Sequence, residues 1–214
     1  MEIERLNILK GKVTAVFDKD LISDFKKIET SCLPECLFNV NILEDIRFNS
    51  SNYSESLLNE LLQQFDLDSS ILYKNYNSIS KSEYRKIMII IAIITNKPIL
   101  LLENPTVGLD TKSIKTLIKI LKREKKKNKL IIITSFDSEF LFQTANVIIY
   151  RDRGKYLICN NKYSFFSNKK VLKAFDLAEP RILEFYSIAK KKKIRLMNRD
   201  NINDLIKEIY RNAQ

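Results

Sequence analysis

The stretch KPILLLENPTVGLDT, residues Lys97–Thr111, decides the fold of this chain. It opens with a continuous apolar run of the kind found in strands buried on both faces of a parallel sheet. A polar turn at Glu103 and Asn104 follows, and Pro105–Asp110 then leads into an amphipathic helix. We therefore predict a buried strand that delivers a polar turn at its carboxyl end.

On both sides of this stretch, apolar strands alternate with amphipathic helices. A helix is predicted over Ser80–Asn96, where Ser80 and Glu83 have the spacing of a capping box, and another over Ser54–Leu67, with Ser54 as N-cap. Such alternation predicts a parallel sheet with right-handed crossovers. The other predicted elements are strands at Lys12–Phe17 and Lys129–Phe136, helices at Leu21–Ile28 and Ser113–Asn128, and a hairpin around Asp152, Arg153 and Gly154.

The chain is basic, with 37 Lys and Arg against 26 Asp and Glu, a formal charge of +11 over 214 residues. Such a surplus can indicate binding to nucleic acid or to an anionic membrane, or the charged residues can simply lie on a solvated surface. The runs at Lys122–Lys129 and Lys190–Lys193 fall at predicted helix ends, where cations are commonplace. We therefore favour a solvated surface and do not expect a nucleic-acid partner.

Cysteine and histidine usage excludes several classes of site. Three cysteines, Cys32, Cys36 and Cys159, have no paired spacing, which fits a reducing cytosol and argues against disulfides or zinc. With no histidine in the chain, Ser-His and Cys-His catalysis are excluded. No signal peptide is evident, and the apolar run Ile87–Thr95 is shorter than the roughly 20 residues that cross a bilayer. We expect a cytoplasmic protein, at most peripheral at the inner face of the cell membrane.

From Asn75 to Leu157 the order of elements resembles an ATP-binding cassette (ABC) ATPase. The segment NSISKSEYRKIMIIIAIITNKPILLLENPTVGLD matches the family's signature helix, Walker B strand and D-loop without a gap. The flanks LPECLFNVNILEDIRF and FFSNKKVLKAFDLAEPRILEFYSIAKKKKI resemble the ATPase subunits of energy-coupling-factor transporters. The resemblance implies an α/β fold: a truncated P-loop-NTPase-like parallel sheet with a helical subdomain and a helical C-terminal extension. It also implies a core over 1–160, a helical subdomain over about 45–96, and an extension over 161–214.

The phosphate-binding loop is where the resemblance fails first. That loop needs glycines, because bare backbone N–H groups must wrap the phosphates. The family places it directly after the strand Lys12–Phe17, where this chain has DKDLISDF, with acidic Asp18 and Asp20 and a single Lys19. The three glycines of the chain are Gly11, Gly108 and Gly154. The front of the chain is also short, and about thirty residues of the sheet subdomain are expected to be missing between Ile28 and Thr30, judged from typical strand lengths.

The family's catalytic positions also differ in this chain. Glu103 stands for the Walker B Asp and is the single candidate metal ligand, while Asn104 stands for the catalytic Glu. An amide orients water but does not accept its proton, and Asn104 has the alternative role of capping the turn after the strand. Ser135 falls at the switch histidine and Cys32 at the Q-loop glutamine. No catalytic residue is therefore expected.

The signature differs from the family's pattern, whereas the D-loop retains it. The signature's Ser-Gly-Gly-Gln becomes Ser80, Lys81, Ser82 and Glu83, so side chains stand where the family lets a phosphate approach a helix N-terminus. We expect no nucleotide binding there, although Lys81 could attract a phosphate. The family's D-loop contact across a dimer is retained as Gly108, Leu109 and Asp110, and these residues alternatively only start the next helix.

The sequence thus leads to a pseudo-ATPase as the first hypothesis: a structural or regulatory partner in a transporter complex. The expected partners are a second ABC ATPase subunit or a second copy, together with a membrane coupling subunit that docks at NILEDIRF, residues 41–48. No cofactor is expected; ATP and Mg²⁺ enter only if this hypothesis is wrong. The alternatives are a weakly active ABC ATPase driving uptake, with Glu103 as its magnesium ligand, and a basic nucleic-acid-binding module.

Overall fold

A single six-stranded sheet organises the computed structural model, which describes residues 9–37, 40–50, 52–192, 196, 199 and 202–212. The strand order is β2-β3-β4-β1-β5-β6, and all neighbours are parallel except the β5–β6 pair. The strands are β1 (Lys12–Phe17), β2 (Thr30–Cys32), β3 (Ile99–Glu103), β4 (Leu130–Thr134), β5 (Val147–Asp152) and β6 (Lys155–Cys159).

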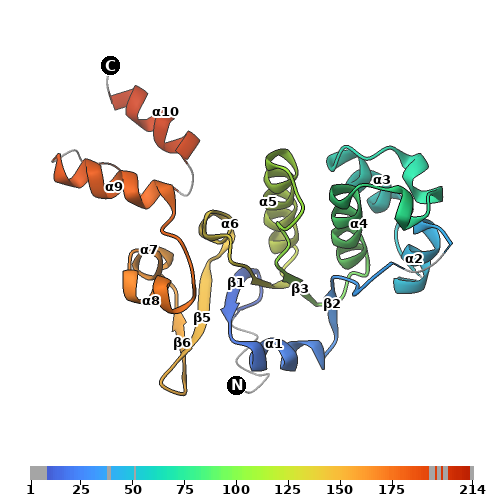
Figure 1. The fold of residues 1–214 in the computed structure, drawn as a ribbon, viewed down its shortest axis with the longest axis horizontal. Coiled ribbons are helices and arrows are strands. Elements are labelled where there is room, and N and C mark those ends of the chain that lie inside the picture. The colour runs from blue at the N-terminus through green and yellow to red at the C-terminus, as the bar shows by residue number, and fades with distance from the viewer. Residues whose placement is uncertain are drawn as a thin grey trace.

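Helices surround this sheet (Figure 1). The α-helices are α1 (Lys19–Lys26), α2 (Ile42–Asn49), α3 (Glu55–Gln64), α4 (Lys81–Ile94), α5 (Thr111–Lys126), α6 (Ser138–Thr144), α7 (Lys162–Phe166), α8 (Lys169–Ala174), α9 (Arg181–Lys191) and α10 (Ile202–Asn212). Two 3₁₀ turns, η2 (Ser69–Tyr73) and η3 (Tyr76–Ser78), connect α3 to α4. No helix in these described ranges is long and apolar enough to cross a membrane.

The sheet forms where the sequence places long apolar runs. The three central residues of β3 are fully buried, and Leu100 pairs with Ile131 of β4. Strands buried on both faces favour such unbroken aliphatic runs. The predicted hairpin is confirmed as β5–β6, with Arg153 at φ +46° and Gly154 at φ +77° in its turn. Left-handed backbone at both central positions is what a tight hairpin turn requires.

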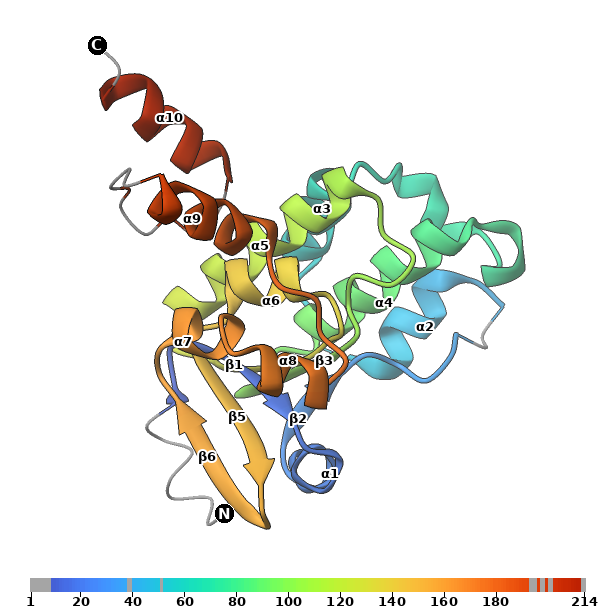
Figure 2. The same cartoon turned by 60° about the vertical axis from the view of Figure 1, so that its left-hand side comes forward.

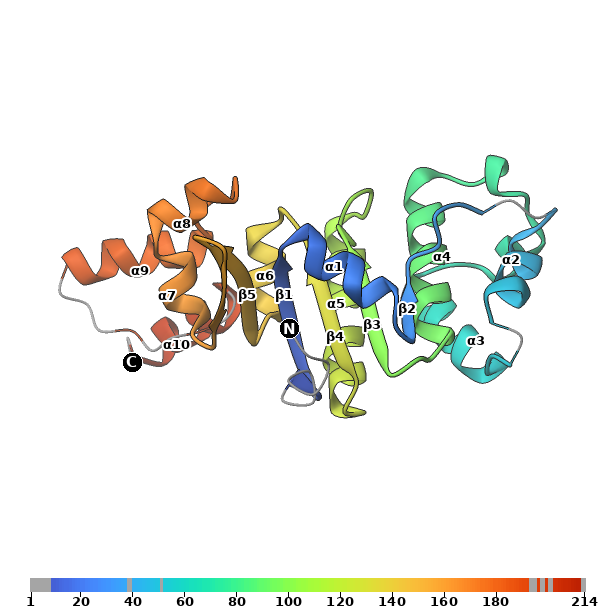
Figure 3. The ribbon, with the colours of Figure 1, turned by 90° about the horizontal axis from the view of Figure 1, so that it is seen from below.

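The two faces of the sheet carry cores of different size. On one face α4, α5 and α6 cover the larger core, and on the other α1 lies across the strands, as the view from below shows (Figure 3). Helix α1 buries Leu21, Ile22 and Phe25 against Val16 and Ile132. This places the last turn of α1 close to the carboxyl end of β3.

The chain turns directly from α1 into β2, since the residues between them, 27–29, form only a short turn. Thr30 closes this turn by donating its hydroxyl to the carbonyl of Phe25 at 2.7 Å. The chain thus passes from α1 to β2 through a local helix-to-strand connection, and β2 is an edge strand beside β3.

Helices α7 and α8 lie beside β5 (Figure 2), and aromatic rings make their contacts with the sheet. Phe165 of α7 stacks on Phe17 with ring centroids 5.6 Å apart, and Phe175, just after α8, lies 5.2 Å from the same ring. Tyr150 of β5 makes edge contacts with both phenylalanines. These contacts bring residues 174–176 over the end of β1.

Candidate functional site

A cavity of about 690 Å³ opens at the carboxyl ends of β1, β3 and β4. Ligands in open α/β sheets bind at this edge of the strands. Helix α1 forms one wall, and residues 174–176 form another. The lining residues are Val16, Phe17, Asp18, Lys19, Ile22, Ser23, Lys26, Glu103, Asn104, Thr134, Ser135, Phe136, Ala174, Phe175 and Asp176.

Asp18 alone connects β1 to α1 and caps the helix. Its Oδ1 accepts a hydrogen bond from the backbone N–H of Leu21 at 2.8 Å. Arg151 of β5 lies 3.2 Å from Asp18 Oδ2, and the Tyr156 hydroxyl donates to Oδ1 at 3.3 Å. The carboxylate is therefore held on one side by the helix N-terminus and on the other by the hairpin.

Glu103, the candidate metal ligand, is bound by a lysine. Lys26 Nζ lies 2.5 Å from Glu103 Oε1, and both side chains are about half exposed. The hydrogen bond to Glu103 is the main cause that raises the pKa of Lys26 above its ordinary value. Among the residues that the structure describes, no three His, Cys, Asp or Glu side chains gather as a metal cluster.

Asn104 adopts a left-handed backbone, φ +44°, directly after β3. Asparagine tolerates this conformation better than most residues. Its backbone N–H donates to Thr134 at 2.8 Å, and its carbonyl accepts from Val107 at 3.2 Å. Arg85 of α4 donates to the carbonyls of both Glu103, at 2.8 Å, and Asn104. The backbone at Asn104 thus forms the turn after the strand.

Ser135 and Cys32 lie at different distances from the cavity. Ser135 follows β4, lines the cavity, and accepts a hydrogen bond on Oγ from the backbone N–H of Asp137 at 3.1 Å. This bond fixes the turn into α6. Cys32 ends β2 outside the lining set, and burial raises the pKa of its thiol while nearby Lys26 acts in the opposite direction. The structure therefore brings Glu103, Asn104 and Ser135 together but leaves Cys32 at the margin.

The predicted capping box at the start of α4 is confirmed. Ser80 Oγ accepts from the backbone N–H of Glu83 at 3.2 Å, and Glu83 Oε2 accepts from the backbone N–H of Ser80 at 2.7 Å. The backbone bond from Ser80 lowers the pKa of Glu83. Two of the helix's free N–H groups are therefore satisfied by its own side chains. Lys81 and Ser82 follow in the first turn of the helix.

Gly108, Leu109 and Asp110 lie beside this helix start. Gly108 has φ +82°, and a Cβ built on it would lie 3.7 Å from the carbonyl oxygen of Lys81. Leu109 N–H donates to Thr106 at 3.1 Å, and Asp110 caps α5 by accepting from the N–H of Ser113 at 2.8 Å. That backbone bond is the main cause that lowers the pKa of Asp110. The D-loop positions thus start α5, and Gly108 lies close to Lys81 of the signature positions.

The sequence analysis did not identify several residues of the site. The spacing of Lys26 could have indicated its position: Lys19, Ile22, Ser23 and Lys26 are spaced as one face of a helix, and all four line the cavity. No sequence pattern indicates the positions of Arg85 and Arg151, because their partners lie far away in the sequence.

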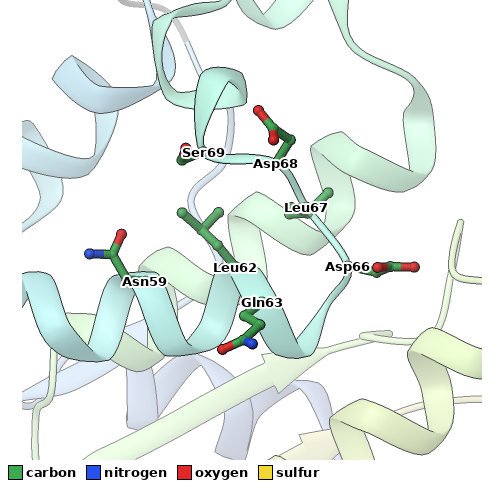
Figure 4. Close-up of a pocket in the computed structure, with 7 residues that line it drawn as sticks. All are labelled: Asn59, Leu62, Gln63, Asp66, Leu67, Asp68 and Ser69. Atoms are coloured by element: carbon green, nitrogen blue, oxygen red, sulfur yellow. The ribbon is translucent and has the colours of Figure 1, made fainter.

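A second, shallower hollow of about 530 Å³ lies at the end of α3 and the turn into η2 (Figure 4). Asp66 stands at its rim with φ +59° and forms an ion pair with Lys112 at 2.7 Å. The hydrogen bond from Lys112 lowers the pKa of Asp66. This contact ties the α3 end to the start of α5. The lining residues are Asn59, Leu62, Gln63, Asp66, Leu67, Asp68 and Ser69.

Comparison with known proteins finds relatives among ABC transporter ATP-binding proteins. It is 28% identical over 211 residues to a putative ABC transporter ATP-binding protein of Mycoplasma genitalium, covering 95% of this chain and 58% of the relative. It is 26% identical over 154 residues to an energy-coupling factor transporter ATP-binding protein of Mycoplasmoides gallisepticum, covering 69% of this chain and 48% of the relative. The chain thus spans about half of the length of these curated relatives. No family model matches it.

Solved structures share the fold. The cbiO1 subunit of the Clostridium perfringens ABC transporter complex cbiONQ has a TM-score of 0.59 at 18% identity, covering 83% of this chain and 88% of that one. A dimeric bacterial ABC transporter cassette has a TM-score of 0.54 at 16% identity, covering 69% and 85%. At such identities the likeness concerns the fold alone. The predicted resemblance to ABC ATPases and the α/β fold class are confirmed.

Proposed function

Because the homologues of this chain are ABC transporter ATP-binding proteins, including energy-coupling-factor ATPases, we propose that it is a pseudo-ATPase of that type. In this role it is a structural or regulatory partner within a transporter complex. It neither binds nor hydrolyses ATP. The observation that carries the proposal is the ion pair between Lys26 and Glu103.

The Lys26–Glu103 ion pair supports the absence of a magnesium site. Glu103 stands where the resemblance puts the acid that holds Mg²⁺, and Lys26 occupies its carboxylate at 2.5 Å. A divalent cation would have to displace this ammonium group and would then meet a repulsive charge beside it. Mg²⁺ also demands near-ideal octahedral geometry, usually with carboxylates and substrate phosphates.

The start of α1 supports the absence of a triphosphate site. A phosphate cradle needs free N–H groups on a glycine loop. Here Asp18 accepts a hydrogen bond from the Leu21 N–H, and Arg151, which pairs with both Asp18 and Asp20, offsets only one of their two negative charges. Each like-charge contact with a phosphate would cost about 1–4 kcal/mol near the surface. These residues do not fit the polyphosphate of ATP.

Pairing with an intact subunit would not restore hydrolysis. In the family that this chain resembles, each ATP site joins one subunit's phosphate loop to the other's signature. The site that needs this chain's loop would meet Asp18, and the site that needs its signature would meet the capping box of Ser80 and Glu83. Neither composite site would be complete.

Two kinds of partner fit the exposed surface. The D-loop face carries Val107 and Phe136, which are 66% and 69% exposed, and we assign it to a second cassette, another subunit or a second copy. The helical face carries exposed Val40, Phe48 and Tyr73, which suit a membrane coupling subunit. The chain would then lie peripherally at the cytoplasmic face of the membrane.

Calorimetry with MgATP tests the proposal. We expect no saturable heat that depends on Mg²⁺ up to millimolar nucleotide, whereas micromolar affinity that requires Mg²⁺ would refute the proposal. Co-purification with a second cassette subunit or a membrane coupling protein should succeed, and a chain that stays alone would count against the assigned role. If slow hydrolysis is observed, Glu103→Ala separates the alternatives: a weak ATPase loses it, whereas a contaminating enzyme does not.

A further inference from the structure

A separate cavity lies near the amino end of β1, at the other end of this strand from Asp18. It measures about 70 Å³. A single water needs about 10–15 Å³ of such space, so the cavity has room for roughly five non-hydrogen atoms. Its floor is apolar, with Val13 among the lining residues, and its rim belongs to α5, α6 and α7, of which α5–α6 and α6–α7 pack side by side.

Three lysines line this cavity. Lys122 and Lys125 come from the last turns of α5, and Lys162 is the first residue of α7. Among the described lining residues there is no carboxylate. The nearest acidic residue in the sequence, Glu124, is buried and bound by Lys127 and Lys129 at 2.8 and 3.0 Å. Its charge is thus balanced by other lysines of the same basic run.

Neutral donors stand beside the lysines. Asn146 Oδ1 accepts hydrogen bonds from the Val13 N–H at 3.1 Å and from Lys125 Nζ at 3.4 Å. Because its oxygen is occupied, the amide nitrogen of Asn146 is left to donate. Gln143 supplies a second side-chain amide to the lining. Ammonium and amide donors around a recess of this size suit a phosphate group.

The ordinary explanation for lysines at helix ends covers only part of this cluster. Lys122 and Lys125 lie near the carboxyl end of α5, where the helix dipole favours cations. Lys162 lies at the amino end of α7, where the helix dipole does not favour a cation. Its Nζ lies 5.0 Å from the centre of the Phe142 ring. The carboxyl end of α5 contributes about half a negative charge, which is less than the two ammonium groups of Lys122 and Lys125 that line the cavity.

We propose that this cavity binds the phosphate of a small phosphorylated ligand. An adjoining hollow of about 480 Å³ shares Asn146 and Lys162 with it and is also lined by Asn160, Asn161 and Tyr163. The amides and the tyrosine ring of this hollow would contact the polar body of the ligand. The site is separate from the proposed function, because it lies at the opposite end of the sheet and does not depend on whether the chain binds ATP.

Titration with inorganic phosphate and pyrophosphate tests this site. Binding should be saturable, with one ligand per chain. Lys122→Gln with Lys125→Gln should weaken it at least about tenfold, because two charged donors are removed from the cavity. The matched control is Lys115→Gln with Lys126→Gln, which removes the same charge from exposed positions of α5 outside the cavity. The control should bind within about twofold of the unmodified chain.

Three results would overturn the site. One is the absence of saturable binding to the folded chain, and another is equal weakening in the control, which would mean attraction by overall charge. The third is binding of single-stranded RNA without binding of pyrophosphate, which would instead support a basic nucleic-acid surface. Lys162→Gln is a second variant, on a different helix, and should weaken pyrophosphate binding even if the double variant of α5 fails to fold.

Discussion

Lys26, in the last turn of α1, forms an ion pair with Glu103 at the end of β3. The pair joins a helix on one face of the sheet to the strand whose carboxyl end carries the candidate metal ligand. It places a tethered ammonium group at the site that the family resemblance gives to a metal ion. The contribution of this ion pair to the stability of the chain can be measured.

The energetic prediction concerns Lys26→Met, Glu103→Gln and the double variant. Both side chains are about half exposed, so solvent weakens their attraction, and we expect a coupling of about 0.2–1 kcal/mol in a double-mutant cycle. Urea unfolding of the four proteins measures it. Strictly additive effects of the two substitutions would contradict the ion pair.

The same pair predicts a pH dependence. The hydrogen bond to Glu103 raises the pKa of Lys26 above its ordinary 10.5, although burial acts in the opposite direction. A raised pKa means that this stabilisation is fully present below pH 10.5 and is lost as pH rises through the folded value. The stability difference between the unmodified chain and Lys26→Met should thus stay constant from pH 7 to about pH 10 and shrink above it.

Local chemistry explains which parts of the fold could be predicted from the sequence. The strand Lys12–Phe17 and the β5–β6 hairpin follow from runs of neighbouring residues, and both are confirmed. The capping box of Ser80 and Glu83 needs only two residues three apart. Such features depend only on residues close to one another in the sequence, so they could be predicted without the tertiary structure.

Contacts between distant segments explain the rest. Arg85 reaches the carbonyls of Glu103 and Asn104 because α4 packs beside β3, and no local pattern marks that reach. Phe165 and Phe175 read as part of an extension after the core, yet their rings pack on Phe17 in the sheet. The wall that residues 174–176 give to the cavity was therefore not predictable from periodicity.

Gly108→Ala separates the two interpretations of the D-loop positions. Left-handed backbone costs an alanine roughly 1–2 kcal/mol, while the new methyl group has ordinary contacts, the nearest at 3.7 Å. Gly154→Ala is the matched control, since Gly154 has φ +77° with nothing within 4 Å. We expect similar losses of unfolding free energy in both, and a loss of partner co-purification in Gly108→Ala alone. If both variants capture the partner equally well, Gly108 only starts α5.

Glu83→Gln tests the capping box through its pH dependence. The backbone bond from Ser80 lowers the pKa of Glu83 below its ordinary 4.5. A lowered pKa means that the stabilisation is present above pH 4.5 and is lost as pH falls through the folded value. The unmodified chain should thus exceed Glu83→Gln in stability at pH 7, and the difference should vanish in acid. A difference that persists at about pH 2 would show another cause.

Ser80→Ala should lower the free energy of unfolding by about 0.5–2 kcal/mol, because it removes the N-cap side chain of α4.

Glu124→Gln should destabilise the chain far more than an exposed substitution of the same kind. The Glu124 side chain is 1% exposed, and Lys127 and Lys129 bind its two oxygens at 2.8 and 3.0 Å. Removing one partner of a buried ion pair costs about 3–5 kcal/mol, because the other charge stays buried, here that of Lys129. Burial raises the pKa of Glu124, but the bonds from both lysines outweigh it and keep it below 4.5.

Asp66→Asn is the matched control for this last prediction, because Asp66 is 74% exposed and pairs with Lys112 at the surface. It should cost no more than about 1 kcal/mol in urea unfolding at pH 7. The excess cost of Glu124→Gln should disappear as pH falls through the lowered pKa of Glu124, since the protonated carboxyl group then resembles the amide. Equal costs at pH 7 would mean that Lys127 and Lys129 turn to solvent freely, and that the basic run is available as a surface after all.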